Sequence, residues 1–188
     1  MHVETIIAGF GGQGILMAGQ LLAEAGMLSG QQVTWVPSYG PEMRGGVANC
    51  AVILADDPIG SPVVGEPDVV IAMNRPSMEK FSTLVRPGGV VIINSSIMEN
   101  TIERHDVRVV EVPCNAIADE LGSPRVATIV ALGAFLEATK ALEPSAIVEA
   151  LRHVLPARRH NLIPLNEQAL ERGAAVARGE RALVATQG

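Results

Sequence analysis

The part of the sequence that most constrains the fold is an apolar, β-branched run at Val3 to Ala8 that leads directly into the glycine-rich turn GFGGQG at Gly9 to Gly14. Glycines bound the run, which predicts a buried strand. The next residues, Gly14 to Ser29, repeat apolar side chains at intervals of three and four, which predicts a helix that Gly30 ends. A strand, a glycine turn and a helix in direct succession indicate an α/β fold.

The rest of the chain continues this alternation. Further strands are predicted at 33–36, 47–55, 68–73, 90–94 and 107–112, and further helices at 76–85, 115–121, 125–142, from 143–145 onward, and at 164–178. The turn DDPIG and a short extended piece at Pro62 to Val64 predict an antiparallel hairpin with strand 47–55. We therefore expect a Rossmann-like, mostly parallel sheet with helices on both faces and an antiparallel hairpin insertion. The chain has 188 residues, which suits a single domain, 1–188, with a frayed tail at 180–188.

Composition excludes several classes of function. Charged residues make up 18% of the chain, aromatic residues 3%, and the net charge is -6. The acidic balance and the scarcity of aromatic rings argue against nucleic-acid binding. No apolar stretch reaches the length of a membrane span, and the N-terminus lacks a basic region, so we expect a cytoplasmic protein without membrane contact. The low charged fraction suggests surfaces buried against other chains, and it allows self-association of the isolated chain.

The residues that commonly carry catalysis or bind metals form no recognisable set. Cys50 and Cys114 lie far apart and outside any CxxC pair, so this chain alone is not expected to hold an iron–sulfur cluster or a structural zinc ion. Cys50 lies in an apolar strand pattern, which favours a buried, inert thiol over a nucleophile. None of the four histidines has a cysteine or carboxylate at ligand spacing. We predict no catalytic and no metal-binding residue.

The glycine turn is the first candidate site. It satisfies the pattern GxGxxG directly after a strand and at a helix start, where free backbone amides can meet an anion. The predicted cofactor contacts in this turn are Gly9, Gly11, Gly12, Gln13 and Gly14. A dinucleotide-binding protein should also carry an acidic residue at the end of its second strand, but here that strand ends in Pro37-Ser38. Phosphate binding and simple close packing of a helix or a partner both remain open.

The second candidate site is the loop SYGPEMRGG, which follows the carboxyl end of strand 33–36, where α/β sheets place their ligands. Its arginine can hold a carboxylate or a phosphate through two hydrogen bonds, and its tyrosine can donate one. A surface loop with a local ion pair is the alternative. The predicted contacts in the loop are Ser38, Tyr39, Gly40, Pro41, Glu42, Arg44, Gly45 and Gly46. Asn74, expected to cap the helix that begins near Pro76, is a further candidate contact.

These motifs, together with NRPSMEKF at 74–81 and VPCNAIADELG at 112–122, resemble the gamma subunit of 2-oxoacid:ferredoxin oxidoreductases over most of the chain. The loop SYGPEMRGG is the specific element. The version PSYGPEMRGGVANC followed by GSPVV is most similar to the enzymes that act on 2-oxoglutarate. The family often has an asparagine near the start of helix 125–142, where this chain has Arg125-Val126-Ala127-Thr128, so a polar role at that place is in doubt.

The resemblance implies an accessory subunit that is not catalytic alone. Its expected partners are the alpha and beta (thiamine-binding) subunits and a ferredoxin-like subunit, with ferredoxin as electron acceptor. Thiamine diphosphate, magnesium and iron–sulfur clusters are expected on those partners, and contact of this chain with CoA is a further expectation. The assembly would oxidatively decarboxylate a 2-oxoacid to an acyl-CoA. A stand-alone NAD(P)-binding or other nucleotide-binding reductase and a purely structural subunit remain as alternatives.

Overall fold

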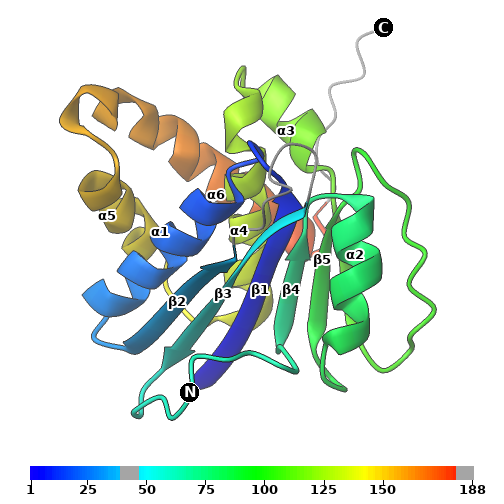
Figure 1. Ribbon diagram of the computed structural model, residues 1–188. Coiled ribbons are helices and arrows are strands. Elements are labelled where there is room, and N and C mark those ends of the chain that lie inside the picture. Colours follow the sequence, from blue (N-terminus) through cyan, green and yellow to red (C-terminus); the bar gives the residue numbers. More distant parts are fainter. Residues whose placement is uncertain (39–46, 181–188) are drawn as a thin grey trace, which may run out of the picture.

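A six-stranded sheet with the order β2-β3-β1-β4-β5-β6 forms the centre of the fold (Figure 1). This structure is a computed structural model, which describes residues 1–38 and 47–180. Strands β1, β4, β5 and β6 run parallel to one another, whereas β3 runs antiparallel to both of its neighbours, β1 and β2. The strands are β1 (His2–Phe10), β2 (Gln32–Ser38), β3 (Val47–Ala55), β4 (Val69–Ala72), β5 (Val90–Asn94) and β6 (Arg108–Val112).

The antiparallel hairpin is present, but β2 and not Pro62–Val64 is the partner of β3. Strand β3 pairs along its whole length with β1, from His2 opposite Ala55 to Phe10 opposite Val47. On its other side it pairs with all of β2. Val52 to Ala55 are all buried, and the backbone N–H and C=O groups of a buried strand need partners at both edges. Pro58 and Pro62 cannot donate ladder hydrogen bonds, and residues 56–68 form no strand.

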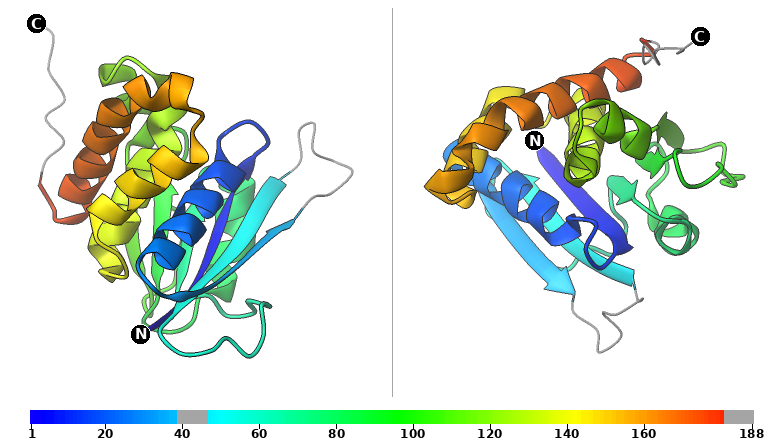
Figure 2. Two further views of the ribbon diagram at one scale, coloured as in Figure 1. Left: turned by 90° about the vertical axis from the view of Figure 1, so that its left-hand side faces the viewer. Right: turned by 90° about the horizontal axis from the view of Figure 1, so that it is seen from above.

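Helices cover both faces of the sheet, but unequally (Figure 2). One face carries α1 (Ile15–Leu28), α3 (Cys114–Glu120), α4 (Ala127–Thr139), α5 (Pro144–Val154) and α6 (Ile163–Ala177). The other carries the short α2 (Arg75–Phe81) and the segment that joins β5 to β6. Three 3-10 turns, η1 (Ser82–Leu84), η2 (Pro124–Val126) and η3 (Ala157–Leu162), complete the elements. The predicted helices at 76–85 and 125–142 are thus each divided into an α-helix and a 3-10 turn.

Glycine ends helix α1 as predicted. Gly30 has a φ of +79°, a left-handed conformation that favours glycine. Its N–H donates to the carbonyl of Met27 at 3.0 Å, and the N–H of Gln31 donates to the carbonyl of Gly26 at 3.0 Å. This pair of bonds is a Schellman motif, which satisfies carbonyls that the helix leaves free.

Helix α4 lies at the centre of the larger core and is buried continuously from Ala127 to Leu136. It packs against the sheet on one side and against α6 on the other. Gly133 of α4 and Gly173 of α6 form what we call the glycine seam, because a methyl group added at Gly133 would overlap the backbone of Leu170. A methyl group at Gly173 would overlap the carbonyl of Val130. The absence of both side chains therefore allows the two helix backbones to touch.

The last described residue is held in place. The N–H of Glu180 donates to the carbonyl of Ala175 at 3.0 Å, and its carboxylate pairs with Arg178 at 2.8 Å. The predicted frayed tail otherwise falls on 181–188, which lies outside the described residues. No helix within the described ranges combines the length and apolar composition that crossing a bilayer requires.

Candidate functional site

Those predicted site residues that the structure describes lie at the edge of the sheet where the parallel strands end, which we call the carboxyl edge. The glycine turn follows β1 at this edge, and Asn74 follows β4. Ser38 ends β2 at the same edge, because β1 and β2 both run antiparallel to β3. Asn49 of β3 stands opposite Ser38 on one side and opposite Ala8 on the other. The structure thus brings Ser38, the glycine turn and Asn74 to one end of the molecule.

The glycine turn has a backbone that glycine adopts most readily. Gly12 and Gly14 have φ angles of +92° and +79°, and Gly14 directly precedes the first residue of α1. Gly11, Gly12 and Gly14 are exposed. They line a shallow hollow of about 260 Å³ together with Phe10 and Met17. The turn therefore presents bare backbone to whatever approaches it.

Gln13 ties this turn to the neighbouring strand. The backbone N–H of Phe10 donates to Gln13 Oε1 at 2.6 Å, and Gln13 Nε2 donates to the carbonyl of Met73 at 3.2 Å. We predicted Gln13 as a cofactor contact, but both ends of its side-chain amide are engaged within the chain. Gly9 lies beneath it, where an added Cβ would come within 2.6 Å of Gln13 Oε1 and 2.7 Å of Ile15 Cδ1. Gly9 is therefore closely packed, and its contact with a cofactor stays a prediction.

Thr128, in the first turn of α4, holds the glycine turn from the other side. Its hydroxyl donates to the backbone carbonyl of Gln13, and the residue is 3% exposed. Because residues 125–128 lack the asparagine that the family often has, a polar role near the start of this helix was in doubt. No local pattern predicts the contact, because 115 positions separate the two residues.

Asn74 caps helix α2, as predicted. Its Oδ1 accepts a hydrogen bond from the N–H of Ser77 at 2.8 Å, and the residue is 1% exposed. Its Nδ2 and the hydroxyl of Ser77 have no hydrogen-bond partner among the described residues. Asn74 is thus a buried polar residue behind the glycine turn, joined to it through Met73, whose N–H donates to the carbonyl of Ala8 at 2.8 Å.

The remaining predicted contacts belong to the second motif. Ser38 is exposed at the end of the outermost strand, β2. The others lie outside the described residues: Tyr39, Gly40, Pro41, Glu42, Arg44, Gly45 and Gly46.

Both thiols are buried. Burial raises the pKa of Cys50 to about 11, and its Sγ lies 3.7 Å from the carbonyl oxygen of Ile15. Burial also raises the pKa of Cys114 far above the usual range of a thiol. Both cysteines are therefore neutral and inaccessible at neutral pH, as predicted for Cys50. In the part of the chain that the structure describes, no three histidine, cysteine or carboxylate side chains come together as a metal site.

The carboxyl edge can therefore make contacts through backbone amides, but its described side chains form no acid–base or nucleophilic set. Its geometry is fixed from within by Gln13 and Thr128. This arrangement suits the close approach of a ligand phosphate or of another polypeptide.

Residues 4–176 match the family model described as "Pyruvate ferredoxin/flavodoxin oxidoreductase". Ketoisovalerate oxidoreductase subunit VorA of Methanothermobacter marburgensis is 37% identical over 94% of this chain, and the match covers 37% of the relative. The chain thus spans little more than a third of the length of that relative. The match with 2-oxoglutarate synthase subunit KorC of Methanocaldococcus jannaschii, at 33% identity, covers 83% of this chain and 85% of the relative.

Two solved structures share the fold. The gamma subunit of a keto/oxoacid ferredoxin oxidoreductase from Geobacter sulfurreducens is 28% identical, with a TM-score of 0.83 over 96% of this chain and 98% of the other. A chain of 2-oxoglutarate:ferredoxin oxidoreductase from Magnetococcus marinus gives a TM-score of 0.86 at 24% identity. That match covers 95% of this chain and 31% of the other, and it shows the likeness of fold alone.

Proposed function

The chain belongs to the pyruvate ferredoxin/flavodoxin oxidoreductase family, and from this membership we propose that it is the gamma-type accessory unit of a 2-oxoacid:ferredoxin oxidoreductase. The whole assembly would oxidatively decarboxylate a 2-oxoacid, form an acyl-CoA and pass electrons to ferredoxin. Thiamine diphosphate, magnesium and iron–sulfur clusters would be held by the alpha, beta and ferredoxin-like partners in the cytoplasm. The observation that carries this proposal is the match of residues 4–176 to the family model. The carboxyl edge supports an accessory role, because it offers exposed glycine backbone while Gln13 is engaged internally.

The sheet order argues against the alternative of a stand-alone NAD(P)-dependent reductase. In dinucleotide-binding folds the second strand lies beside the first, and an acidic residue at its end holds the ribose. Here the antiparallel strand β3 separates β2 from β1. Strand β2 also ends in Pro37-Ser38, without a carboxylate. The usual place of the ribose contact is therefore occupied by a strand of opposite direction.

We propose CoA as the ligand of the glycine turn. The amino end of helix α1 and the exposed glycines before it can accept a phosphate group. The hollow beside the turn has a volume of about 260 Å³, below the roughly 300 to 1,000 Å³ of sites that enclose a whole cofactor. We therefore propose that this chain contacts only part of CoA and that partner subunits enclose the rest.

For the substrate we propose 2-oxoglutarate, on the strength of the loop version PSYGPEMRGGVANC. The named relatives act on different oxoacids at similar identity, 37% for the ketoisovalerate subunit and 33% for the 2-oxoglutarate subunit. Overall identity therefore does not decide between these oxoacids, and the proposal of 2-oxoglutarate rests on the loop version alone. The ratio of kcat/KM for 2-oxoglutarate over pyruvate and 2-ketoisovalerate, measured on the assembled enzyme, tests the assignment.

The test of the proposed function is reconstitution. Co-expression of this chain with the thiamine-binding and ferredoxin-like chains encoded beside it should yield a stable complex that reduces ferredoxin only when a 2-oxoacid and CoA are both present. Failure to form such a complex, or tight binding of NAD or NADP by the isolated chain in calorimetry, would contradict the proposal.

Two variants of the assembled enzyme separate CoA contact from a purely structural role. Gly12→Ala should raise the KM for CoA, because it alters the exposed turn, whereas the matched Gly60→Ala at an open loop position should leave this KM unchanged. Arg44→Ala should also raise it if Arg44 holds the ligand. If both Gly12→Ala and Arg44→Ala only weaken assembly at an unchanged KM for CoA, the subunit is a scaffold.

A further inference from the structure

A small apolar pocket lies beside the carboxyl edge and is separate from the glycine turn. It has a volume of about 160 Å³ and opens between α1, α4 and the segment that joins α5 to α6. Leu21 and Ile129 form part of its buried wall, and Met17 and Leu162 are each 38% exposed. The same Met17 also borders the hollow beside the glycine turn, so the two sites adjoin at this residue.

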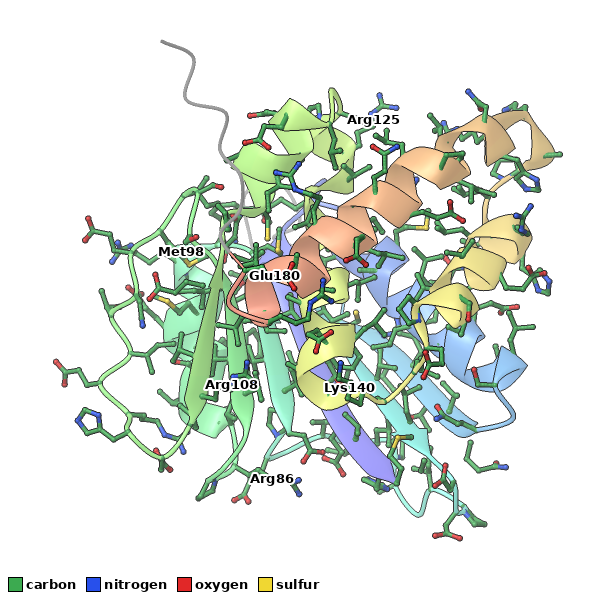
Figure 3. All side chains as sticks on the ribbon, turned by 180° about the vertical axis from the view of Figure 1, so that it is seen from behind. Arg86, Met98, Arg108, Arg125, Lys140 and Glu180 are labelled. Carbon is green, nitrogen blue, oxygen red and sulfur yellow. The ribbon has the colours of Figure 1, made fainter. Side chains whose placement is uncertain are left out.

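Two arginines line this pocket. Arg125 and Arg159 belong to its lining, and Arg158 is the exposed neighbour of Arg159 in η3. No aspartate or glutamate takes part in the lining, which consists of described residues throughout. Figure 3 shows Arg125 at the upper end of the molecule, well above Lys140 and Arg86. We call this place the arginine-rimmed pocket.

The charge of this rim is not neutralised within the described part of the chain. Other arginines pair with carboxylates there, namely Arg86, Arg104, Arg152, Arg172 and Arg178. Arg125, Arg158 and Arg159 form no such pair with any described residue. Arg75, Lys80 and Arg108 also form no ion pair with a described residue, but they lie away from this pocket. In a chain of net charge -6, Arg125 and Arg159 thus place two unneutralised positive charges at one apolar pocket. Such a rim attracts a negatively charged partner.

The size of the pocket indicates what enters it. At about 160 Å³ it is well below the roughly 300 to 1,000 Å³ of small-molecule sites. It has room for one aliphatic or aromatic side chain. Protein interfaces commonly place one such anchor in a pocket and surround it with polar contacts. We propose that the arginine-rimmed pocket receives a single apolar side chain from an acidic segment of a partner protein, whose carboxylates pair with Arg125 and Arg159.

The proposal is tested on the isolated full chain, so its outcome does not depend on the proposed function. Met17 provides the reporter, because its methyl group can be labelled with carbon-13 and observed by NMR. The probe is the capped peptide Asp-Glu-Leu-Glu-Asp, and the control peptide has serine in place of leucine. We expect the leucine peptide to shift the Met17 resonance in a saturable manner, with a dissociation constant near 1 mM, and the serine peptide to bind on the order of tenfold more weakly.

Charge reversal supplies matched variants. Arg159→Glu, and separately Arg125→Glu, should weaken binding of the leucine peptide at least tenfold, since each replaces an attractive charge with a repulsive one. Arg152→Glu is the control, because Arg152 is also an exposed arginine but pairs with Glu149 and does not line the pocket. The dispersion of the other methionine methyl resonances reports whether each variant is folded, and either folded charge variant suffices for the test.

Four results would overturn the proposal. The first is no Met17 shift with the leucine peptide at 10 mM, and the second is equal binding by the wild type and a folded Arg159→Glu or Arg125→Glu variant. In the third, octanoate shifts Met17 but the peptide does not, which would indicate a site for small amphipathic anions. In the fourth, the Met17 shift depends on protein concentration without any peptide and is lost in Arg159→Glu, which would identify a second copy of this chain as the occupant.

Discussion

The glycine turn and the glycine seam use the same residue for opposite purposes. In the turn, Gly12 has a positive φ of +92° and no atom within 4 Å of an added Cβ. In the seam, Gly133 and Gly173 have ordinary helical backbones, but an added Cβ would overlap the facing helix. The turn needs glycine for the shape of its backbone, and the seam needs it for the space.

This difference separates the binding surface from the fold. The seam joins α4 to α6 in the larger core, so substitutions there should lower the stability of the whole domain. The turn is exposed and is held by Gln13 and Thr128, so substitutions at its exposed glycines should mainly weaken the binding of a ligand or a partner subunit. Four substitutions test this separation.

Gly173→Ala should have the largest effect on stability. The added methyl overlaps the carbonyl of Val130 and lies 3.1 Å from the backbone nitrogen of Ala134, and backbone atoms cannot move aside easily. We expect a loss of about 3 kcal/mol in the free energy of unfolding, measured by urea denaturation. Gly60→Ala, at an open loop position, is the control and should change it by less than about 0.5 kcal/mol. Equal urea midpoints for the two variants would refute the close contact between the helices.

Gly9→Ala should be intermediate, because this position combines features of both regions. Its added methyl would lie 2.6 Å from Gln13 Oε1 and 2.7 Å from Ile15 Cδ1, which are ends of side chains that can move. We expect a loss of about 2 kcal/mol in the free energy of unfolding. The N–H of Phe10 should lose its bond to Gln13 and exchange faster with solvent hydrogen. Unchanged exchange at Phe10 would show that the glutamine contact survives the extra methyl.

Thr128→Val should cost about 1.5 kcal/mol of unfolding free energy, because valine keeps the shape of threonine but leaves the carbonyl of Gln13 without its donor. Thr128→Ser keeps the hydroxyl and should preserve this bond. Amide exchange across the glycine turn would then rise in the valine variant alone. The hydrogen bond would be unimportant if valine and serine gave the same exchange rates.

Gly12→Ala should have the smallest effect on stability, about 1 kcal/mol, since only the backbone at φ +92° is strained. Its effect on binding of CoA or of partner subunits should exceed its effect on stability. Calorimetry on the reconstituted assembly, set beside urea denaturation of the isolated chain, makes the comparison. A large loss of stability with unchanged binding would remove the distinction between turn and seam.

Most of the fold could be predicted from the sequence, because local patterns determine most of its elements. Strand β3 and strand β5 have the predicted bounds, and α1 differs from its prediction by one residue at each end. The pairing of β3 was only partly predictable. Apolar periodicity identifies a strand, but it does not say which strands become its neighbours, and the turn chemistry at 56–60 favoured the wrong partner.

The local structure of the candidate site could be predicted, but its internal contacts could not. The cap at Asn74 is confirmed, and the GxGxxG turn does lie between a strand and a helix, whereas the cofactor contacts of these residues stay predictions. The hydrogen bond from Thr128 to Gln13 depends on how α4 packs against the start of α1. A pattern of residues that are neighbours in the sequence contains no information about this packing. Gln13 could not be interpreted from the sequence for the same reason, because a polar side chain in a glycine turn can bind a ligand or the backbone of an adjacent strand.

The position of β1 between β3 and β4 also determines the order in which the protein can fold during synthesis. Both neighbours of this apolar strand come later in the chain, and β4 ends at Ala72. At translation rates of about 5 to 20 residues per second, the ribosome needs several seconds to extend the chain from β1 to the end of β4. Until β4 has been made, β1 therefore lacks at least one of the two strands that flank it, and the backbone donors and acceptors along that edge have no ladder partner.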